Sequence, residues 1–326
     1  MQVSRESYDV VVVGGGAAGL SGATALARSR RSVLVIDDGT PRNAPADGVH
    51  NFLSRDGTPP GELLAAGRAE VTGYGGEVVD CRVTAAEPLD GGGFRVWTAD
   101  GTTVRARRLL VTTGVVDELP DVPGLAQRWG RDVLHCPYCH GWEVRDRRIG
   151  VLAGSPMVMH QVGLFRQLSQ DVTVFLHQQP MLGDDEREQL AARGIALVQG
   201  EVAGLEVTDD RLTGVRLASG EVVAVDALAV QTRVTARADV LEPLGLQPAD
   251  FVVGDHVLGS HVPAGMAGVS SVPGVWVAGN VTEPMAQVMS SAAAGLMAGA
   301  NINADLVAED TRAAVAAHRE RTATRV

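Results

Sequence analysis

The chain has 326 residues, an apolar fraction of 45% and a formal net charge of −11, and all 28 of its Lys and Arg residues are arginine. This length suggests two domains, each with its own core. The acidic balance argues against nucleic acid or an anionic membrane as partner, and the lack of lysine excludes Schiff-base chemistry. With neither a signal-peptide pattern nor the run of about 18 apolar residues that a membrane span needs, we expect a cytoplasmic protein.

The first strong pattern is YDVVVVGGGAAGLSGATALARSRRSVLVIDD at the N-terminus. It predicts a strand at 10–13, a glycine turn, an alanine-rich helix and a second strand at 32–36. Glycines in such a turn let a pyrophosphate approach the backbone, and the helix N-terminus favours its negative charge. The residues of this predicted dinucleotide site are Gly14, Gly16, Ala17, Ala18 and Gly19. Asp37 stands at the spacing of the carboxylate that binds a ribose hydroxyl.

The three cysteines fall into two groups. Cys81 lies in the strand-like stretch VVDCRVTAA and is predicted to be a small buried hydrophobic residue. Cys136 and Cys139 form a Cys-x-x-Cys pair in HCPYCHGWEV, a spacing that suits a redox pair, half of a metal site or two structural residues. In a reducing cytoplasm, catalysis or metal binding is favoured over a structural role. A zinc site would need further ligands, and His135 and His140 are too adjacent to the cysteines to converge easily on one ion.

Near the C-terminus, GVWVAGNVTEPMAQVMSSAAAGLMAGANINADL predicts a strand, a short turn and a small-residue helix from about Met285. This stretch, LLVTTG at 109–114 and RNAPADGVHNFLSRDG together resemble the low-molecular-weight thioredoxin reductase family, and the resemblance covers nearly the whole chain. It implies an α/β fold of two Rossmann-like three-layer dinucleotide-binding domains, the second inserted in the first. We expect a discontinuous FAD-binding domain at 1–117 and 248–326 and an inserted domain of NADPH type, carrying the cysteine pair, at 118–247.

The same resemblance implies FAD as cofactor and a homodimer as assembly. It adds further residues to the predicted cofactor site. These are Asp38, Arg42, Asn43, His50, Asn51, Thr113, Gly114, Gly279, Asn280, Gln287 and Val288. The family usually has Asp in place of Asn280, and an amide still offers an acceptor and adds donors. The N–H groups near Gln287 and Val288 are expected to face the flavin pyrimidine edge and stabilise the anionic reduced ring.

In the family, the inserted domain binds NADPH through its own strand, glycine turn and helix. Here the strand at 149–153 and the helix are kept, but Pro156 stands where the second glycine should be. Proline has no N–H to donate, and its ring and Met159 fill space that a phosphate needs. After the next strand, His177-Gln178-Gln179 replaces the arginine pair that binds a 2′-phosphate. We expect this domain to keep the fold without binding a nicotinamide cofactor.

By this resemblance Cys139 faces the isoalloxazine and Cys136 exchanges with substrate. His140 replaces the usual Asp after the second cysteine, and an imidazole with a pKa of about 6.5 can accept a thiol proton near neutral pH. His135 is a second candidate base, with a structural role equally open.

CPYCHG beside a degenerate nicotinamide turn resembles the dithiol oxidases of gliotoxin and holomycin biosynthesis. That resemblance implies oxidation of a small natural-product dithiol to an intramolecular disulfide through a mixed disulfide, with O2 reoxidising the flavin to give hydrogen peroxide. The alternatives are a thioredoxin reductase that uses NADPH, a reductase supplied by ferredoxin or another donor, and a non-catalytic flavin-bound redox sensor.

Overall fold

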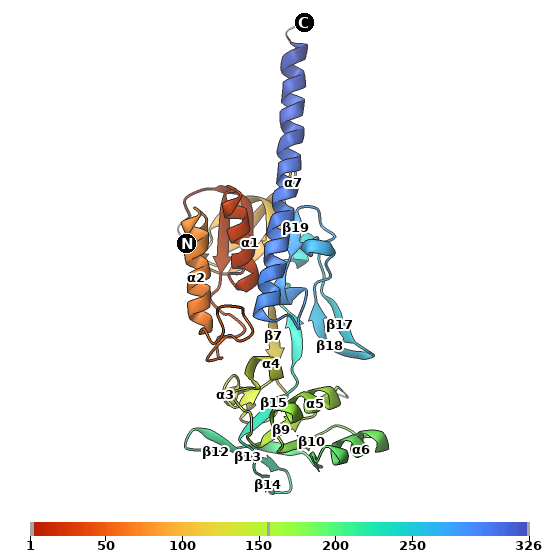
Figure 1. Ribbon diagram of the computed structural model, residues 1–326. Helices are drawn as coiled ribbons and strands as arrows, with labels where there is room; N and C mark the ends of the chain where they lie inside the picture. Colours follow the sequence, from red (N-terminus) through yellow and green to blue (C-terminus); the bar gives the residue numbers. More distant parts are fainter. Residues whose placement is uncertain (1–2, 155–156, 325–326) are drawn as a thin grey trace. The chain divides into compact units, whose positions relative to one another are not determined.

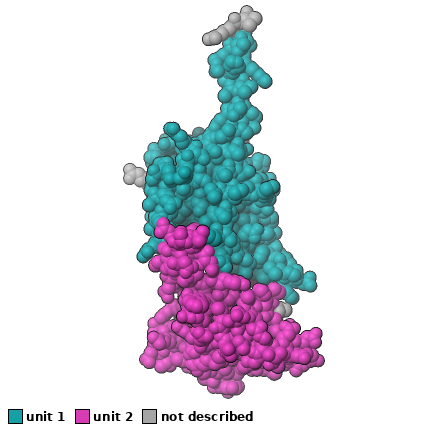
Figure 2. Space-filling model, in the orientation of Figure 1, with its two compact units in different colours: residues 1–42, 61–116, 234–326 teal, residues 43–60, 117–233 magenta. Residues whose placement is uncertain are grey.

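The computed structural model describes residues 3–154 and 157–324. The chain forms two compact units, which Figure 2 colours separately. Unit 1 contains residues 1–42, 61–116 and 234–326, and unit 2 contains residues 43–60 and 117–233. The segment 234–247, expected in the inserted domain, groups with unit 1 because its apolar side chains enter the core of that unit. The segment 43–60 groups with unit 2.

Unit 1 is built on a seven-stranded sheet whose first elements form the predicted strand–helix–strand. Strand β1 (Ser7–Val13) pairs in parallel with β2 (Val33–Asp37), with Val10 opposite Val33, and helix α1 (Ala17–Arg28) connects them. The valine-rich runs of both strands are buried almost throughout, as expected of parallel strands covered on both faces.

The remaining strands of unit 1 extend this sheet and form a smaller one. The large sheet has the order β3-β2-β1-β6-β5-β4, and β19 pairs with the end of β6. Its other strands are β3 (Glu77–Asp80), β4 (Val83–Pro88), β5 (Phe94–Thr98), β6 (Thr103–Val111) and β19 (Val275–Val277). The smaller sheet contains β7 (Val115–Glu118), β16 (Arg233–Ala236), β17 (Ala249–Val253) and β18 (His256–His261). Cys81, between β3 and β4, is half-buried and packs against the core.

The other helices of unit 1 include a long C-terminal one. They are α2 (Pro60–Gly73), α7 (Val288–Ala323) and the 3₁₀ turns Glu242–Leu244, Met266–Gly268 and Gly279–Val281. Helix α7 begins three residues after the predicted Met285, with Gln287 as its N-cap. In Figure 1 its C-terminal part extends beyond the sheet and the other helices of unit 1. No helix in residues 3–154 and 157–324 meets the length and apolarity that crossing a membrane requires.

Helices α1 and α7 pack with their backbones almost in contact. A Cβ on Gly295 would lie 1.9 Å from the carbonyl oxygen of Ala18, and a Cβ on Gly299 would lie 2.6 Å from that of Gly22. No side chain fits at these distances, which explains why both helices are rich in glycine and alanine. The contact also fixes the start of α7 relative to the glycine turn that precedes α1.

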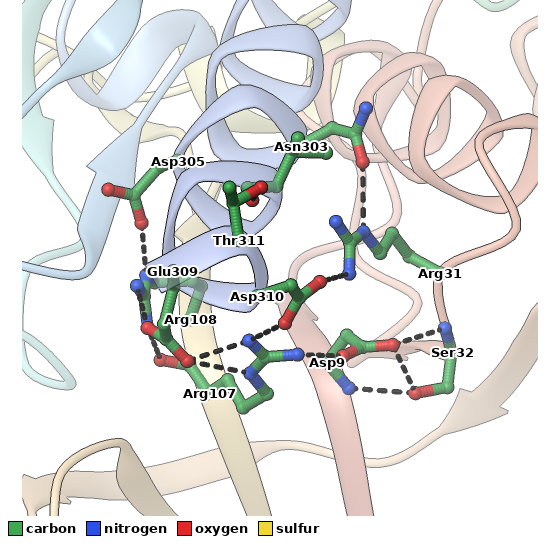
Figure 3. A network of polar contacts seen from close by, with 11 residues as sticks. Asp9, Arg31, Ser32, Arg107, Arg108, Asn303, Asp305, Glu309, Asp310 and Thr311 are labelled. Carbon is green, nitrogen blue, oxygen red and sulfur yellow. Dashed lines mark hydrogen bonds and ion pairs between the residues drawn. The ribbon is translucent and has the colours of Figure 1, made fainter. Parts of the chain in front are cut away.

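A cluster of charged side chains holds the middle of α7 against strand β6 (Figure 3). Arg108 pairs with Asp305 at 2.6 Å and also with Glu309, and Arg107 pairs with Glu309 and Asp310, both at 2.6 Å. Hydrogen bonds from Arg108 and Arg107 lower the pKa of Glu309. The Glu309 carboxylate therefore remains charged at neutral pH and keeps the helix paired with the strand.

Unit 2 contains a second parallel sheet, of order β11-β10-β9-β15-β8. Its strands are β8 (Val133–Leu134), β9 (Ile149–Leu152), β10 (Val172–Phe175), β11 (Ala196–Val198) and β15 (Ala227–Val230). An antiparallel sheet contains β12 (Val202–Thr208), β13 (Arg211–Leu217) and β14 (Val222–Val223). The helices are α3 (Leu125–Arg128), α4 (Pro137–His140), α5 (Val158–Leu168) and α6 (Asp184–Ala192).

We expect Gly295→Ala to lower the free energy of unfolding by about 1–3 kcal/mol, because the added methyl group would overlap the Ala18 carbonyl. Gly61→Ala in α2 is the matched control, since a Cβ there meets no atom within 4 Å. That substitution should raise the free energy of unfolding by about 0.5–1 kcal/mol. Urea unfolding followed by circular dichroism measures both, and equal effects would contradict the close contact of the helices.

Candidate active site

The two cysteines of HCPYCHGWEV lie in one short turn of unit 2. Cys136 and Cys139 form a disulfide with their Cα atoms 5.2 Å apart. Cys136 is the N-cap of α4, and its sulfur accepts a hydrogen bond from the Cys139 N–H at 3.2 Å. Pro137 occupies the first helical position, where a missing N–H is tolerated. Both cysteines are half-buried, so the disulfide is open to attack by a thiolate.

Gly141 ends this turn at a position without space for a side chain. A Cβ there would lie 2.2 Å from the carbonyl oxygen of Pro137 and 2.3 Å from Cδ1 of Leu168, which belongs to α5. Helix α5 therefore packs directly under the cysteine turn. The glycine that follows His140 in the sequence is required by this packing.

His140 is the last residue of α4 and is half-buried. Burial lowers the pKa of its imidazole below the ordinary value, because desolvation disfavours the charged ring. The carboxylates of Glu143 and Asp47 act in the opposite direction, and His50 adds to the lowering. The ring is consequently neutral at pH 7, which is the form that accepts a proton.

His135 is held between strands β8 and β15 next to the cysteine turn. Its Nδ1 lies 3.0 Å from the Val230 carbonyl oxygen, and because a carbonyl can only accept, Nδ1 carries the hydrogen. Gln161 donates through Nε2 to the His135 carbonyl at 2.9 Å. These bonds fix the ring and its tautomer, with the lone pair of the neutral ring on Nε2, while the role of His135 as a base stays a prediction.

His50 and Asn51, which we predicted as cofactor residues, contact the cysteine turn within unit 2. The His50 ring lies 3.3 Å from Asp56 through Nδ1 and 3.4 Å from Glu143 through Nε2. Asn51 donates through Nδ2 to the Tyr138 carbonyl at 2.8 Å and adopts a φ of 60°. Asparagine tolerates this left-handed conformation. Sequence reasoning missed Glu143 and Asp56, although Glu143 stands three residues after His140.

The glycine turn of unit 1 has the shape of a cofactor cradle. Gly14 adopts a φ of 103°, and a Cβ on Gly19 would lie 2.0 Å from the Gly14 carbonyl oxygen. Gly16 has no atom within 4 Å of the position of a Cβ, which leaves open space for a pyrophosphate. Thr112 closes the turn by donating to the carbonyls of Val13 at 3.1 Å and Gly14 at 2.9 Å.

Asp37 is fixed from two sides at the end of β2. Its Oδ1 accepts from the Gly15 N–H at 2.9 Å, and its Oδ2 pairs with Arg68 at 2.6 Å. Each oxygen keeps a second lone pair for a ribose hydroxyl. Arg68 was not predicted as a site residue, because no local sequence pattern distinguishes it from the other residues of α2. The neighbouring Asp38 accepts from the Thr40 hydroxyl at 2.7 Å.

Asn280 organises the turn that leads into α7. Its Nδ2 lies 3.1 Å from the carbonyl oxygen of Glu283, 3.2 Å from that of Pro284 and 2.8 Å from that of Ala286. Arg42 donates to the Pro284 carbonyl at 2.9 Å. Since carbonyls only accept, the amide nitrogen must face them, and Oδ1 is the acceptor that the side chain retains. The family's usual Asp could not make these bonds.

A buried hydroxyl beside the cradle fits a bound FAD. Among the residues that the structure describes, Ser291 is buried and its Oγ has no hydrogen-bond partner. A Cβ on Gly279 would lie 2.9 Å from Cβ of Ala18 and 3.9 Å from Cβ of Ser291, so this hydroxyl lies near the start of both α1 and α7. An unpaired buried donor beside two helix N-termini suits an anionic ligand rich in acceptors.

The other predicted cofactor residues have contacts of their own. Gln287 and Val288 form the N-cap and first position of α7. The Thr113 hydroxyl donates to the Arg237 carbonyl at 2.6 Å, and the Arg237 N–H donates to the Gly114 carbonyl at 3.0 Å. Asn43 lies in unit 2, where its carbonyl accepts from the Ala46 N–H at 3.0 Å. Ser155 and Pro156, on which the expected obstruction of a nicotinamide depends, lie outside the described residues.

His177, Gln178 and Gln179, which follow β10, stand at the expected 2′-phosphate position. All three make hydrogen bonds within unit 2. His177 accepts from the Val202 N–H at 3.0 Å through Nδ1, and Gln179 donates to the Gly154 carbonyl at 3.5 Å. Gln178 donates to the Glu201 carboxylate at 3.2 Å. Glu201 thus puts a negative charge where a 2′-phosphate would need cations. Met159 packs against the core of unit 2.

Comparison with known proteins identifies the family. The sequence matches the pyridine nucleotide-disulphide oxidoreductase family over residues 8–299. The chain belongs to this family, and FAD, which its members bind, is its cofactor. It is therefore an oxidoreductase, and the predicted cofactor is confirmed. Within 3–154 and 157–324, no cluster of three His, Cys, Asp or Glu side chains could hold a metal ion.

Individual relatives agree with the predicted resemblance. The chain is 32% identical over 325 residues to the thioredoxin reductase tcpT of Claviceps purpurea, covering 92% of this chain and 95% of tcpT. It is 29% identical over 322 residues to the thioredoxin reductase sirT of Leptosphaeria maculans, covering 94% and 96%. The crystal structure of HlmI matches with a TM-score of 0.88 and 44% identity, covering 97% and 98%. The thioredoxin reductase-like fold of two Rossmann-like domains is thus confirmed.

We expect Asn280→Asp, although it restores the family's usual residue, to weaken FAD binding at least about tenfold. The carboxylate would face three carbonyl oxygens and loosen the start of α7. Asn303→Asp is the matched control, because Asn303 accepts from Arg31 at 2.9 Å and a carboxylate accepts equally well. FAD retention after dilution, followed by flavin fluorescence, measures both. Unchanged retention in Asn280→Asp would show that the amide does not organise the cradle.

Proposed function

We propose that this protein is an FAD-dependent dithiol oxidase, which closes an intramolecular disulfide in a small natural-product dithiol and uses O2 as electron acceptor. One observation carries the proposal: a half-exposed Cys136–Cys139 disulfide is followed directly by His140, a half-buried imidazole with a lowered pKa. That arrangement suits removal of protons from thiols better than a carboxylate would. The similarity to HlmI and to the fungal relatives supports disulfide chemistry at this pair.

In the proposed reaction, His140 accepts the proton of the first substrate thiol. The resulting thiolate attacks the sulfur of Cys136, the Cys136–Cys139 bond breaks, and Cys139 leaves as a thiolate. The second substrate thiol then attacks the substrate sulfur of the mixed disulfide, which closes the substrate disulfide and releases Cys136, and the proton of this thiol passes to the Cys136 sulfur. FAD, when bound, would supply the two-electron acceptor for the cysteine pair, with O2 as the final acceptor and hydrogen peroxide as the product.

The contacts around Glu201 favour this direction over NADPH-dependent reduction. A 2′-phosphate needs arginine or lysine, whereas His177, Gln178 and Gln179 are bonded to their own unit and a carboxylate lies among them. The alternative is a disulfide reductase that draws electrons from NADPH, from ferredoxin or from another donor.

The deciding experiment is anaerobic stopped-flow absorbance of the flavin. We expect dithiothreitol to bleach it, NADPH to leave it oxidised, and air to restore it with release of hydrogen peroxide. Cys136→Ser and Cys139→Ser should abolish bleaching by dithiothreitol, whereas Cys81→Ser should retain it, and His140→Gln should slow it about 100-fold. Rapid bleaching by NADPH would make the protein a reductase, and bleaching by neither would leave a donor such as ferredoxin or a redox sensor.

The proposal includes a homodimer formed through the exposed face of α7. Apolar residues recur there at intervals of three and four, as in helices that pack on another helix. They are Met289, Ala293, Leu296, Ala300, Ala304, Val307 and Ala314. All seven are exposed, and the stripe is interrupted at one position by Thr311. A second copy of the chain would cover this stripe.

Light scattering tests the dimer. We expect Ala300→Glu, on the apolar stripe, to shift the protein toward the mass of a monomer, because it would bury an unpaired charge. Ala313→Glu, on the opposite side of the same helix, should leave the mass unchanged. A monomeric wild-type protein, or equal masses for both variants, would remove this part of the proposal.

A cytoplasmic location is also proposed, supported by the free thiol of Cys81.

A further inference from the structure

The segment 43–60 carries a set of polar side chains that meet the cysteine turn within unit 2. His50 lies between two carboxylates, 3.3 Å from Asp56 and 3.4 Å from Glu143, and its side chain is 24% exposed. Glu143 stands three residues after His140 in the turn that follows α4. Asn51 ties the same segment to the turn through the Tyr138 carbonyl at 2.8 Å. A partly buried contact between an imidazole and two carboxylates therefore lies beside the base of the proposed reaction.

We propose that His50 and Glu143 form a charge pair that sets the basicity of His140, and that the segment 43–60 is thereby a functional part of the thiol-oxidising site. This inference rests on the proposed function, in which His140 accepts a thiol proton. His50 and Glu143 are positioning residues in this proposal, because they act on His140 and not on the reacting sulfurs.

The two members of the pair act on His140 in opposite directions. The Glu143 carboxylate stabilises the imidazolium that forms when His140 accepts a proton, and so raises the pKa of His140. A protonated His50 disfavours the same imidazolium, and by pairing with Glu143 it also offsets part of that residue's charge. The result is a base that burial keeps neutral before the reaction and that Glu143 stabilises once it is charged.

Asp56 holds His50 in place. The Asn51 N–H donates to Asp56 Oδ1 at 2.8 Å while Asp56 Oδ2 faces the His50 ring. Hydrogen bonds from Asn51 and His50 lower the pKa of Asp56, so its carboxylate is charged throughout the range in which His140 titrates. The position of His50 is thus determined by residues of its own segment as well as by Glu143.

The other charged groups near His140 are few. Asp47, in the same segment, raises the pKa of His140 along with Glu143. On α5, which packs against α4, the titratable side chains are the exposed His160 and Arg166, whose guanidinium donates to the carbonyls of Arg193 and Ser169. The disulfide cysteines do not titrate. Glu143 and His50 are therefore the pair whose removal should change the titration of His140 in opposite directions.

The test is an NMR titration of the His140 ring in the oxidised holoprotein, with the resonance assigned by its loss in His140→Gln. We expect Glu143→Gln to lower the titration midpoint and His50→Gln to raise it, each by about half a pH unit or more. Glu188→Gln and His160→Gln, at exposed positions in unit 2, are the matched controls and should leave it unchanged. Glu143→Asp, which keeps the charge, should restore most of the wild-type value and guards against a variant that merely fails to fold.

The same variants are then followed by anaerobic flavin reduction with dithiothreitol between about pH 5 and pH 8, across the ordinary range of histidine. The midpoint of the rising limb should move in the direction found by NMR, whereas a purely structural role would lower the rate without moving the midpoint. Midpoints that stay fixed, or that shift the same way in both variants, would overturn the inference. If dithiothreitol bleaches no flavin in the wild-type protein while the NMR midpoints shift as expected, the proposed function fails and the charge pair stands.

Discussion

The cofactor site of unit 1 depends on the backbone contact between α1 and α7. Because Gly22, Gly295 and Gly299 leave no room for side chains, the two helices meet at a fixed distance. Their N-termini therefore lie next to the glycine turn, where backbone N–H groups and the Ser291 hydroxyl are available to an anionic ligand. The charged cluster of Arg107 and Arg108 with the acids of α7 holds the helix along the sheet from further down its length.

In unit 2, close packing at a glycine also restricts the cysteine turn. Leu168 of α5 packs against Gly141, so the turn that carries the disulfide lies directly on this helix. His140, the last residue of this turn, is half-buried, and burial is the largest cause of its lowered pKa. Burial therefore keeps a neutral imidazole next to the Cys136–Cys139 disulfide, and this arrangement is the basis of the proposed oxidase chemistry.

The second Rossmann-like domain owes its fold to apolar packing. Strand β9, helix α5 and the parallel sheet keep their apolar cores, and these depend on burial and not on nucleotide binding. The residues after β10 satisfy their polar groups inside the unit, through Gly154, Glu201 and Val202. Helix α5 of this domain also packs against the cysteine turn through Leu168.

The sequence by itself determined the features that depend on contiguous residues. The strand–turn–helix of Gly14 to Gly19 follows from local patterns of glycine and apolar residues. For HCPYCHGWEV, the Cys-x-x-Cys spacing left a redox pair, a metal site and a structural role open, and the folded turn holds the two cysteines as a disulfide. Tertiary structure decided the rest. Helix α7 starts at Val288 and not at Met285, because Asn280 and the distant Arg42 bind the carbonyls of the preceding turn. The pairing of His50 with Glu143 joins residues 93 positions apart (143 − 50), and no local pattern reports a contact that only the folded chain creates.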